Sequence, residues 1–367
     1  MRDPRVEKLA SVLVHYSTHI EPGDKVFIRG MPAAEPLLLA VYEKVLQAGG
    51  HPQLIVGLPG ADEALFRLAS DEQLEFIPPA FQLFIETYDA SIAIRSDTNT
   101  RALSAIDPAR QAQRSRAMMP VMRTYMRRGA SKELKWVGTQ YPTDAYAQEA
   151  DMSLREYEDF VYAACYCDQD DPIACWQEMH ERQQRLVDWL KGKHGVRVIG
   201  PNADVTLSID GRTFINSDGH NNMPSGEIFT GPVEDSVEGW VRFTYPAITD
   251  GREVEGVELW FEGGKVVKAT AKKGQEFLLQ MLDTDAGSRY LGEFAVGTND
   301  GIQRFTKNIL FDEKIGGSFH MAVGASYPET GGQNESAIHW DMICDMRDGG
   351  EIYVDDELFY RSGEFMI

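Results

Sequence analysis

The chain has 367 residues, of which 43% are hydrophobic and 25% charged, and its formal net charge is −21. This length permits two domains with a full-sized core each, and the composition is that of a soluble globular protein. The negative charge would repel phosphates, so we expect neither nucleic acid nor an anionic membrane as a partner. No apolar run approaches the ~20 residues of a membrane-spanning helix. The N-terminal segment has the pattern of an opening helix rather than that of a signal peptide.

The first half of the chain alternates between helix and strand patterns. Apolar positions recur at helical spacing over 5–19, 34–48, 61–69 and 107–128. Short apolar runs between turn residues, typical of buried strands, cover 25–30, 51–58, 90–96 and 133–142. Such alternation predicts a parallel sheet with flanking helices.

Residues 144–190 have helical patterns again, and Ser153 with Glu156 predicts a capping box at the start of one of these helices. From about residue 196 the chain changes to short strands separated by Gly, Asn and Asp. We therefore predict an α/β domain over 1–195 and an α+β, β-rich metal-binding catalytic domain over 196–367. Four cysteines in so long a chain fit a reducing cytoplasm.

Five residues with metal-binding side chains lie in short apolar runs of the second half. They are Glu227, Glu293, His320, His339 and Asp341. Gly or Pro bounds each run, which predicts buried strands. Because buried carboxylates are costly without a partner, several of them in one place need a cation. The mixed oxygen and nitrogen set suits zinc, cobalt or manganese.

Each residue taken singly has a simpler interpretation. A lone histidine such as His320 is more often a satisfied core residue, and a His-x-Asp pair is often an ordinary hydrogen-bonded pair. On a strand, however, His339 and Asp341 point to the same side while Trp340 packs on the other. Four such segments in one half of the chain make an accidental origin a poor explanation.

The set is large enough for two cations that share a carboxylate. Two metals can hold a bridging hydroxide, polarise a carbonyl and stabilise the charge that develops during hydrolysis. Tyr327, in a turn after His320, could donate a hydrogen bond to the oxyanion, although a turn tyrosine that covers the core fits the spacing equally well. His220 lies close enough to Glu227 in sequence to line the site.

Six blocks of the chain, in order, resemble the thermophilic aminopeptidase family of dinuclear metallopeptidases. The metal-site blocks are NMPSGEIFTGPVEDSVEG, YLGEFAVG, LFDEKIGGSFHMAVGASYPE and AIHWDMI, and two further blocks lie in the N-terminal and central parts. The resemblance implies that the five residues above are metal ligands, that Glu293 bridges the metals, and that Tyr327 is catalytic. It also implies homodimers that act on short peptides. The segment between His320 and His339 is shorter than the family leads us to expect.

Two alternatives stay open at this point. The same fold hosts mononuclear Fe(II) dioxygenases that open dihydroxypyridine rings, and His320, His339 and Asp341 alone would form the required facial triad. Glu227 and Glu293 would then be surplus, which favours the hydrolase. In the other alternative, a closed metal site only holds the C-terminal domain together.

Overall fold

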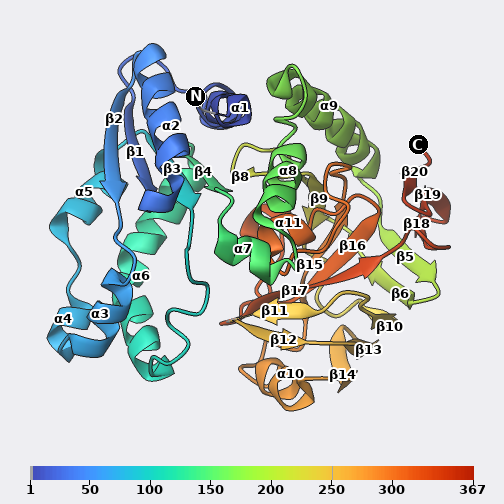
Figure 1. Cartoon of the computed structure of the whole chain (residues 1–367). Coiled ribbons are helices and arrows are strands. Elements are labelled where there is room, and N and C mark those ends of the chain that lie inside the picture. The colour runs from blue at the N-terminus through green and yellow to red at the C-terminus, as the bar shows by residue number, and fades with distance from the viewer. Residues whose placement is uncertain (1–2, 250) are drawn as a thin grey trace. The chain divides into compact units, whose positions relative to one another are not determined.

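The structure is a computed structural model that describes residues 3–249 and 251–367 (Figure 1). The chain forms two compact units, one of residues up to 175 with 219–224, the other of 176–218 with 225–367. The chain thus passes between them after Cys175, after Asp218 and after Pro224. The boundary predicted near residue 195 lies inside the second unit, and the domain limits 1–195 and 196–367 stay a prediction.

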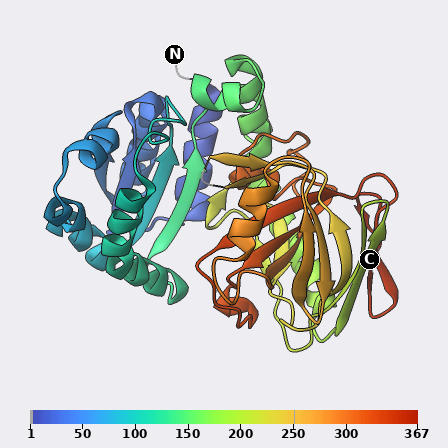
Figure 2. The same ribbon diagram turned by 90° about the horizontal axis from the view of Figure 1, so that it is seen from below.

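A five-stranded parallel sheet forms the centre of the first unit (Figures 1 and 2). Its strand order is β2-β1-β3-β4-β8. The strands are β1 Lys25–Gly30, β2 His51–Val56, β3 Ala90–Arg95, β4 Lys135–Gln140 and β8 Asn222–Met223. The first four confirm the predicted strands. The fifth strand, β8, lies in residues 219–224, where the chain returns to the first unit. The sequence patterns did not indicate this strand.

Helices connect the strands of this sheet. They are α1 Pro4–Ser11, α2 Glu35–Gln47, α3 Ala61–Leu68, α4 Asp71–Glu75, α5 Pro79–Thr87, α6 Pro108–Ala130, α7 Asp144–Glu149 and α8 Leu154–Ala164, with a π-helix η1 Val12–Ser17 and a 3-10 turn η2 Pro32–Ala34. The predicted capping box is present, since Ser153 Oγ accepts from the Glu156 amide and Glu156 Oε2 accepts from the Ser153 amide. The parallel sheet with flanking helices confirms the predicted fold class of this half.

The second unit contains two antiparallel sheets and few helices. The larger sheet has the order β14-β13-β10-β6-β5-β18-β19-β20 and the smaller one β17-β16-β15-β9-β7. The strands are β5 Gly195–Gly200, β6 Ala203–Ser208, β7 Ile215–Ser217, β9 Glu227–Thr230, β10 Glu238–Arg242, β13 Glu258–Glu262, β14 Lys265–Thr270, β15 Leu291–Gly297, β16 Ser318–Gly324, β17 His339–Asp345, β18 Glu351–Val354, β19 Glu357–Arg361 and β20 Glu364–Phe365. Strands β11 Ala247–Thr249 and β12 Arg252–Val254 form a separate pair, and the other elements are α9 Pro172–Leu190, α10 Gln275–Leu282, α11 Ile309–Asp312 and η3 Pro328–Thr330.

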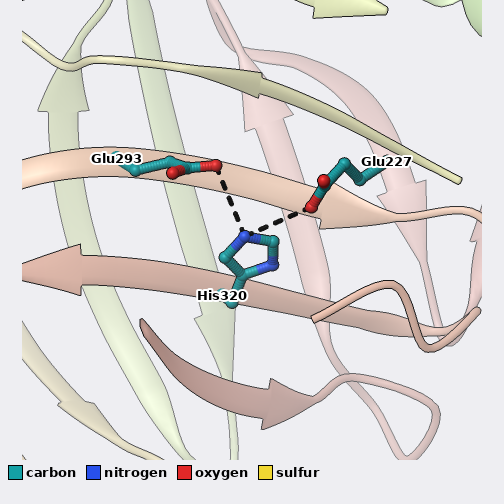
Figure 3. Close-up of side chains that lie close together, drawn as sticks. All are labelled: Glu227, Glu293 and His320. Carbon is teal, nitrogen blue, oxygen red and sulfur yellow. Dashed lines mark ion pairs between the residues drawn. The ribbon is translucent and has the colours of Figure 1, made fainter. Parts of the chain in front are cut away.

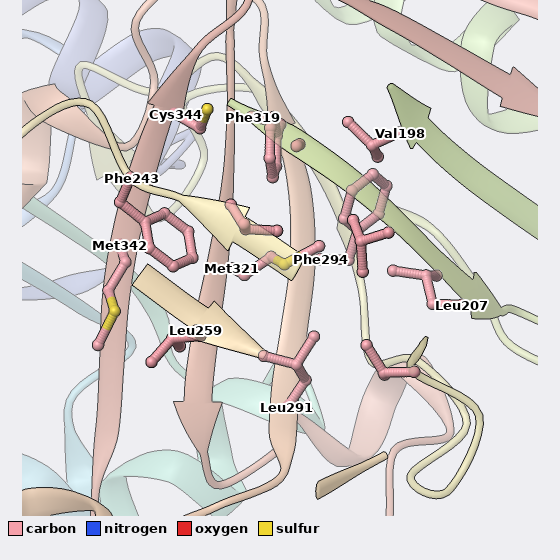
Figure 4. Close-up of a cluster of buried hydrophobic side chains, with 14 of the residues drawn as sticks. Val198, Leu207, Phe243, Leu259, Leu291, Phe294, Phe319, Met321, Met342 and Cys344 are labelled. Atoms are coloured by element: carbon pink, nitrogen blue, oxygen red, sulfur yellow. The ribbon is translucent and has the colours of Figure 1, made fainter. Parts of the chain in front are cut away.

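One hydrophobic core unites both sheets of the second unit (Figure 4). Phe294 of β15, Phe319 of β16 and Met342 of β17 pack with Val198 of β5 and Leu259 of β13. Each such side chain contributes about 1.5–3 kcal/mol by leaving water. Because side chains alternate along a strand, the residues between them on β15, β16 and β17 point to the opposite face of the smaller sheet. That face carries the charged residues described below.

Among the described residues, no helix is long and apolar enough to cross a membrane.

Candidate metal centre

The five predicted ligands come from four neighbouring strands of the smaller sheet. Glu227 begins β9, Glu293 lies on β15, His320 on β16, and His339 and Asp341 on β17. The sheet order β17-β16-β15-β9 therefore aligns them across one face. His339 and Asp341 flank the buried Trp340, as the i, i+2 argument predicts.

Small residues stand opposite the charged ones in the strand register. Ala295 pairs with His320, Gly297 with Glu227, and Ala322 faces Glu293 on one side and Asp341 on the other. A β-bulge between Leu291 and Glu293 shifts the register there, and bulges of this kind re-aim side chains. Space is thus left on this face for the long acidic side chains.

The side chains converge within contact distance (Figure 3). His320 Nε2 lies 3.4 Å from Glu227 Oε2 and 3.5 Å from Glu293 Oε1. His339 Nε2 lies 3.1 Å from Glu293 Oε2 and 3.5 Å from Asp341 Oδ1. Glu293 therefore presents one carboxylate oxygen to each histidine.

Two triads of potential ligands share Glu293. One consists of Glu227, Glu293 and His320, the other of Glu293, His339 and Asp341, and in each the ligand atoms lie within 4.8 Å of one another. Glu227 Oε2 and Asp341 Oδ1 are buried and hydrogen-bond to no described residue. Buried oxygens without a donor have the character of ligands that a cation would satisfy. The donor set thus fits a divalent metal, and metal binding by each of the five residues stays a prediction.

A backbone contact fixes the orientation of one histidine. His339 Nδ1 lies 2.8 Å from the carbonyl oxygen of Ala325. This bond places the proton on Nδ1 and turns Nε2 toward the carboxylates, which is the arrangement that metal-binding histidines adopt.

The carboxylates of the cluster raise the pKa of both histidines. Burial alone would lower the pKa of His320, but Glu293 and Glu227 raise it to about 9. His339 has its pKa raised to about 12, because Asp341 and Glu293 outweigh the effect of burial. Protons and metal cations therefore compete for the same nitrogen atoms.

Two further charged residues lie in this site that the sequence patterns did not single out. Glu313 and Lys314 directly follow helix α11, and Glu313 forms a third triad with His320 and Asp341. Lys314 is fully buried, with its Nζ 3.5 Å from Glu227 Oε1 and in contact with Glu313 Oε1. Burial raises the pKa of Glu313 to about 8, although Lys314 opposes this shift. The signal was an acidic and a basic residue side by side in the apolar block before His320.

Tyr327 follows β16 and lies against the site. Its ring centroid is 5.0 Å from that of His339 and 5.4 Å from that of Phe229. Although 37% of the residue is exposed, burial of its ring, with Glu293 and Asp341 nearby, raises the pKa of the hydroxyl above its usual range. At neutral pH the hydroxyl is therefore a hydrogen-bond donor.

His220 belongs to residues 219–224 of the first unit, where its ring centroid lies 4.7 Å from that of Tyr16, with the ring planes tilted by 39°. Its expected place beside Glu227 stays a prediction.

The backbone at Glu227 is supported from helix α9. The fully buried Gln183 donates through Nε2 to the carbonyls of Glu227 and Ser217, at 3.1 Å each. Its Oε1 accepts from Thr298 Oγ1 at 2.6 Å. Gln183 thus links the start of β9 to the end of β15.

Asp285 ties down the segment that leads to β17. Its carboxylate accepts hydrogen bonds from the amide of Ala337 at 2.7 Å and from Ser336 Oγ. It also accepts from the amides of Gly287 and Ser288. These donors, with Ala337 the strongest, lower the pKa of Asp285 to about 2.

Two cations held close together by carboxylates and histidines are typical of one class of metal-dependent hydrolases. The comparisons agree with that class. The chain belongs to the thermophilic metalloprotease (M29) family, whose sequence pattern matches residues 2–365.

Curated relatives match almost the whole chain. Aminopeptidase 2 of Geobacillus stearothermophilus is 29% identical over 390 residues, which cover 94% of this chain and 93% of that protein. Aminopeptidase T of Thermus thermophilus is 26% identical and covers 98% of this chain and 95% of its own.

Solved structures share the fold. AmpT from Thermus thermophilus superposes with a TM-score of 0.86 at 24% identity, covering 99% of each chain. The 2,5-dihydroxypyridine dioxygenase from Pseudomonas putida KT2440 reaches a TM-score of 0.61 at 13% identity, covering 100% of this chain and 98% of that one. At such identities both likenesses concern the fold alone.

Proposed function

We propose that this metalloprotease is an aminopeptidase that removes N-terminal amino acids from short peptides with the help of two divalent cations. The observation that carries the proposal is the pair of triads that share Glu293. A mononuclear dioxygenase site needs only two histidines and one carboxylate. It would leave the buried Glu227 as a surplus carboxylate, without a hydrogen-bond partner for Oε2 among the described residues.

Glu227 and His320 would hold one cation, His339 and Asp341 the other, and Glu293 both. When bound, the cations supply a Lewis acid for the scissile carbonyl and an acidified water as nucleophile. Tyr327 would donate a hydrogen bond to the oxyanion that forms from the carbonyl. Glu313, which belongs to the third triad, would take the proton released by the attacking water and return it to the leaving amine.

The proposal extends to the metal, the location and the assembly. Zinc, cobalt and manganese all suit the donor set. The four cysteines are free, which suits the reducing cytoplasm. We propose a homodimer on the family resemblance. Sedimentation of the purified protein tests the dimer, and a single species with the mass of one chain would contradict it.

The decisive experiment compares Glu293→Ala with Glu276→Ala, an exposed glutamate of α10 in the same unit. Each protein is loaded with zinc, cobalt or manganese and incubated with a tripeptide and with its N-acetylated form. We expect the wild type and Glu276→Ala to release the first amino acid of the free tripeptide only. Glu293→Ala should release none while keeping its circular dichroism spectrum.

Full peptidase activity of Glu293→Ala would contradict the proposed role of Glu293 as a ligand of both cations. Oxygen uptake by the Fe(II)-loaded protein with a dihydroxypyridine, without peptide hydrolysis, would favour the dioxygenase instead. Elemental analysis adds an independent readout, because the proposal requires about two metal ions per chain.

A further inference from the structure

Lys314 places a buried positive charge closest to one side of the candidate metal centre. Its side chain is fully buried, and its Nζ contacts Glu313 Oε1 and lies 3.5 Å from Glu227 Oε1. In the described part of the chain Lys314 has no ion pair with Glu293 or Asp341, whose ion-pair partners are histidines. The ammonium therefore acts most strongly on the Glu227 triad, and its weaker electrostatic effect extends to Asp341.

The two oxygens of Glu227 have separate partners. Oε1 faces the ammonium of Lys314, whereas Oε2 faces His320 Nε2 at 3.4 Å and has no hydrogen-bond partner among the described residues. A cation between Glu227 and His320 would thus find one carboxylate oxygen available and the other already neutralised. The Asp341 triad has no such competitor among its ion pairs.

Electrostatics then makes the two positions unequal. A unit charge near a divalent cation repels it, and burial weakens the screening that water would provide. We propose that Lys314 makes the position at Glu227, Glu293 and His320 the weaker of two metal positions, so that it fills after the position at Glu293, His339 and Asp341. The inference rests on the two-metal site proposed above.

Lys314 also has a role before the second cation binds. Its ammonium pairs with the carboxylates of Glu227 and Glu313, which would otherwise repel each other. The centre can therefore keep its shape with one cation bound. Lys314 is a positioning residue, since it acts on the metal through Glu227.

The test is a titration of the metal-free full-length protein with Co²⁺, followed by calorimetry and by the visible absorption of bound cobalt. We expect two separate binding steps for the wild type. In Lys314→Met the second cobalt ion should bind more tightly. The ratio of the second dissociation constant to the first should therefore fall by about tenfold or more. Lys314→Arg keeps the charge and should keep two separate steps.

Two comparisons sharpen the assignment. Lys273→Met makes the same change at an exposed lysine that pairs with Glu255, and should leave both steps unchanged. In the wild-type background, Glu227→Gln should remove the weak step and Asp341→Asn the tight one. The opposite assignment would overturn the inference.

Lys314→Met leaves Glu313 without its partner and could fail to fold. The double variant Glu313→Gln/Lys314→Met removes both charges, and the same fall in this ratio is expected there. If these variants bind two Co²⁺ ions with an unchanged ratio of the two dissociation constants, the inference is overturned but the proposed function stays intact. One cobalt ion per chain in the wild type and in every Lys314 variant overturns both.

Discussion

The protonated hydroxyl of Tyr327 limits this residue to one chemical role. Nearby carboxylates and burial of the ring keep the pKa above its usual range, so that Tyr327 donates a hydrogen bond rather than acting as a base. Its ring packs against that of His339, one of the predicted metal ligands. In the role proposed above, such a donor would act on the transition state, where negative charge develops, more than on the bound substrate.

Replacing Tyr327 by Phe should therefore lower kcat for tripeptide hydrolysis by about 10²–10³-fold, the usual loss on removing one oxyanion donor, with little change in KM. Steady-state kinetics measures both constants. The matched control is Tyr353→Phe, because Tyr353 donates to Glu351 on β18 and is only partly buried. A change confined to KM would show that Tyr327 serves in binding alone.

Asp285 acts at the same scale on stability. The pKa of its carboxyl is depressed to about 2 by the amide of Ala337 and the neighbouring donors. A carboxyl whose pKa is lower in the folded than in the unfolded protein stabilises the fold at pH values above its unfolded pKa of about 3.9. This stabilisation is lost as the pH falls through the pKa of the folded protein. The protonated carboxyl no longer holds the segment before β17.

We expect Asp285→Asn to lower the Tm at pH 7, and the difference from the wild type to shrink as the pH falls from about 4 towards 2. Calorimetry across this range provides the data. Asp348→Asn, at an exposed position, should show no such trend. A difference that grew towards acid pH would mean that the hydrogen bonds of Asp285 are not the cause.

Helix α9 and the smaller sheet are joined by a few buried polar contacts. Gln183 is the centre of these contacts, since it bonds to the carbonyls of Glu227 and Ser217 and to Thr298. A buried group that loses its partner keeps the full cost of its desolvation. The position of Glu227 therefore depends on a helix that contributes no ligand of its own.

Gln183→Ala should destabilise the protein by about 1–3 kcal/mol and weaken metal binding at Glu227. Urea unfolding with and without metal measures both effects. Glu181 is exposed on the same helix, so Glu181→Ala provides the control. Equal losses of stability in the two variants would show that helix propensity, rather than the buried contacts, is responsible.

The strands explain how much of the site could be predicted. In β17 the alternation along His339, Trp340 and Asp341 puts both ligands on one face, and residue order alone indicates this. Glu313 and Lys314 precede β16, after a short helix, so no periodicity relates them to the ligands. Their role follows from tertiary folding.

The fold was predictable to a similar extent. The four long parallel strands of the first unit show in the sequence because buried apolar runs between helices have a distinctive pattern. Helices α4 and α5 have only 5 and 9 residues and were not predicted, although Ser70 and Gln73 form a capping box at the start of α4. Neither the two-residue strand β8 nor the bulge before Glu293 has a signal of its own, because both depend on partners distant in sequence.

For the molecule as a whole, the metal is expected to serve catalysis more than folding. The large core of the second unit consists of apolar side chains, whose burial needs no cation. A ligand that binds only the folded state raises its stability by mass action.

EDTA should thus abolish peptide hydrolysis and lower the Tm by a few degrees, with no change in far-ultraviolet circular dichroism. Added Zn²⁺ or Co²⁺ should restore activity. Loss of secondary structure at room temperature on chelation would instead support a purely structural metal. Calorimetry and activity on the same samples distinguish these outcomes.

Strand β8 has a consequence for how the protein can be made. The sheet of the first unit takes its edge strand from Asn222–Met223, which lie beyond the first 43 residues of the second unit, 176–218. On the ribosome this sheet can be completed only after Pro224 has left the exit tunnel. A single cut after Cys175 would yield an N-terminal fragment that lacks β8 and a C-terminal fragment that carries it without a sheet to join.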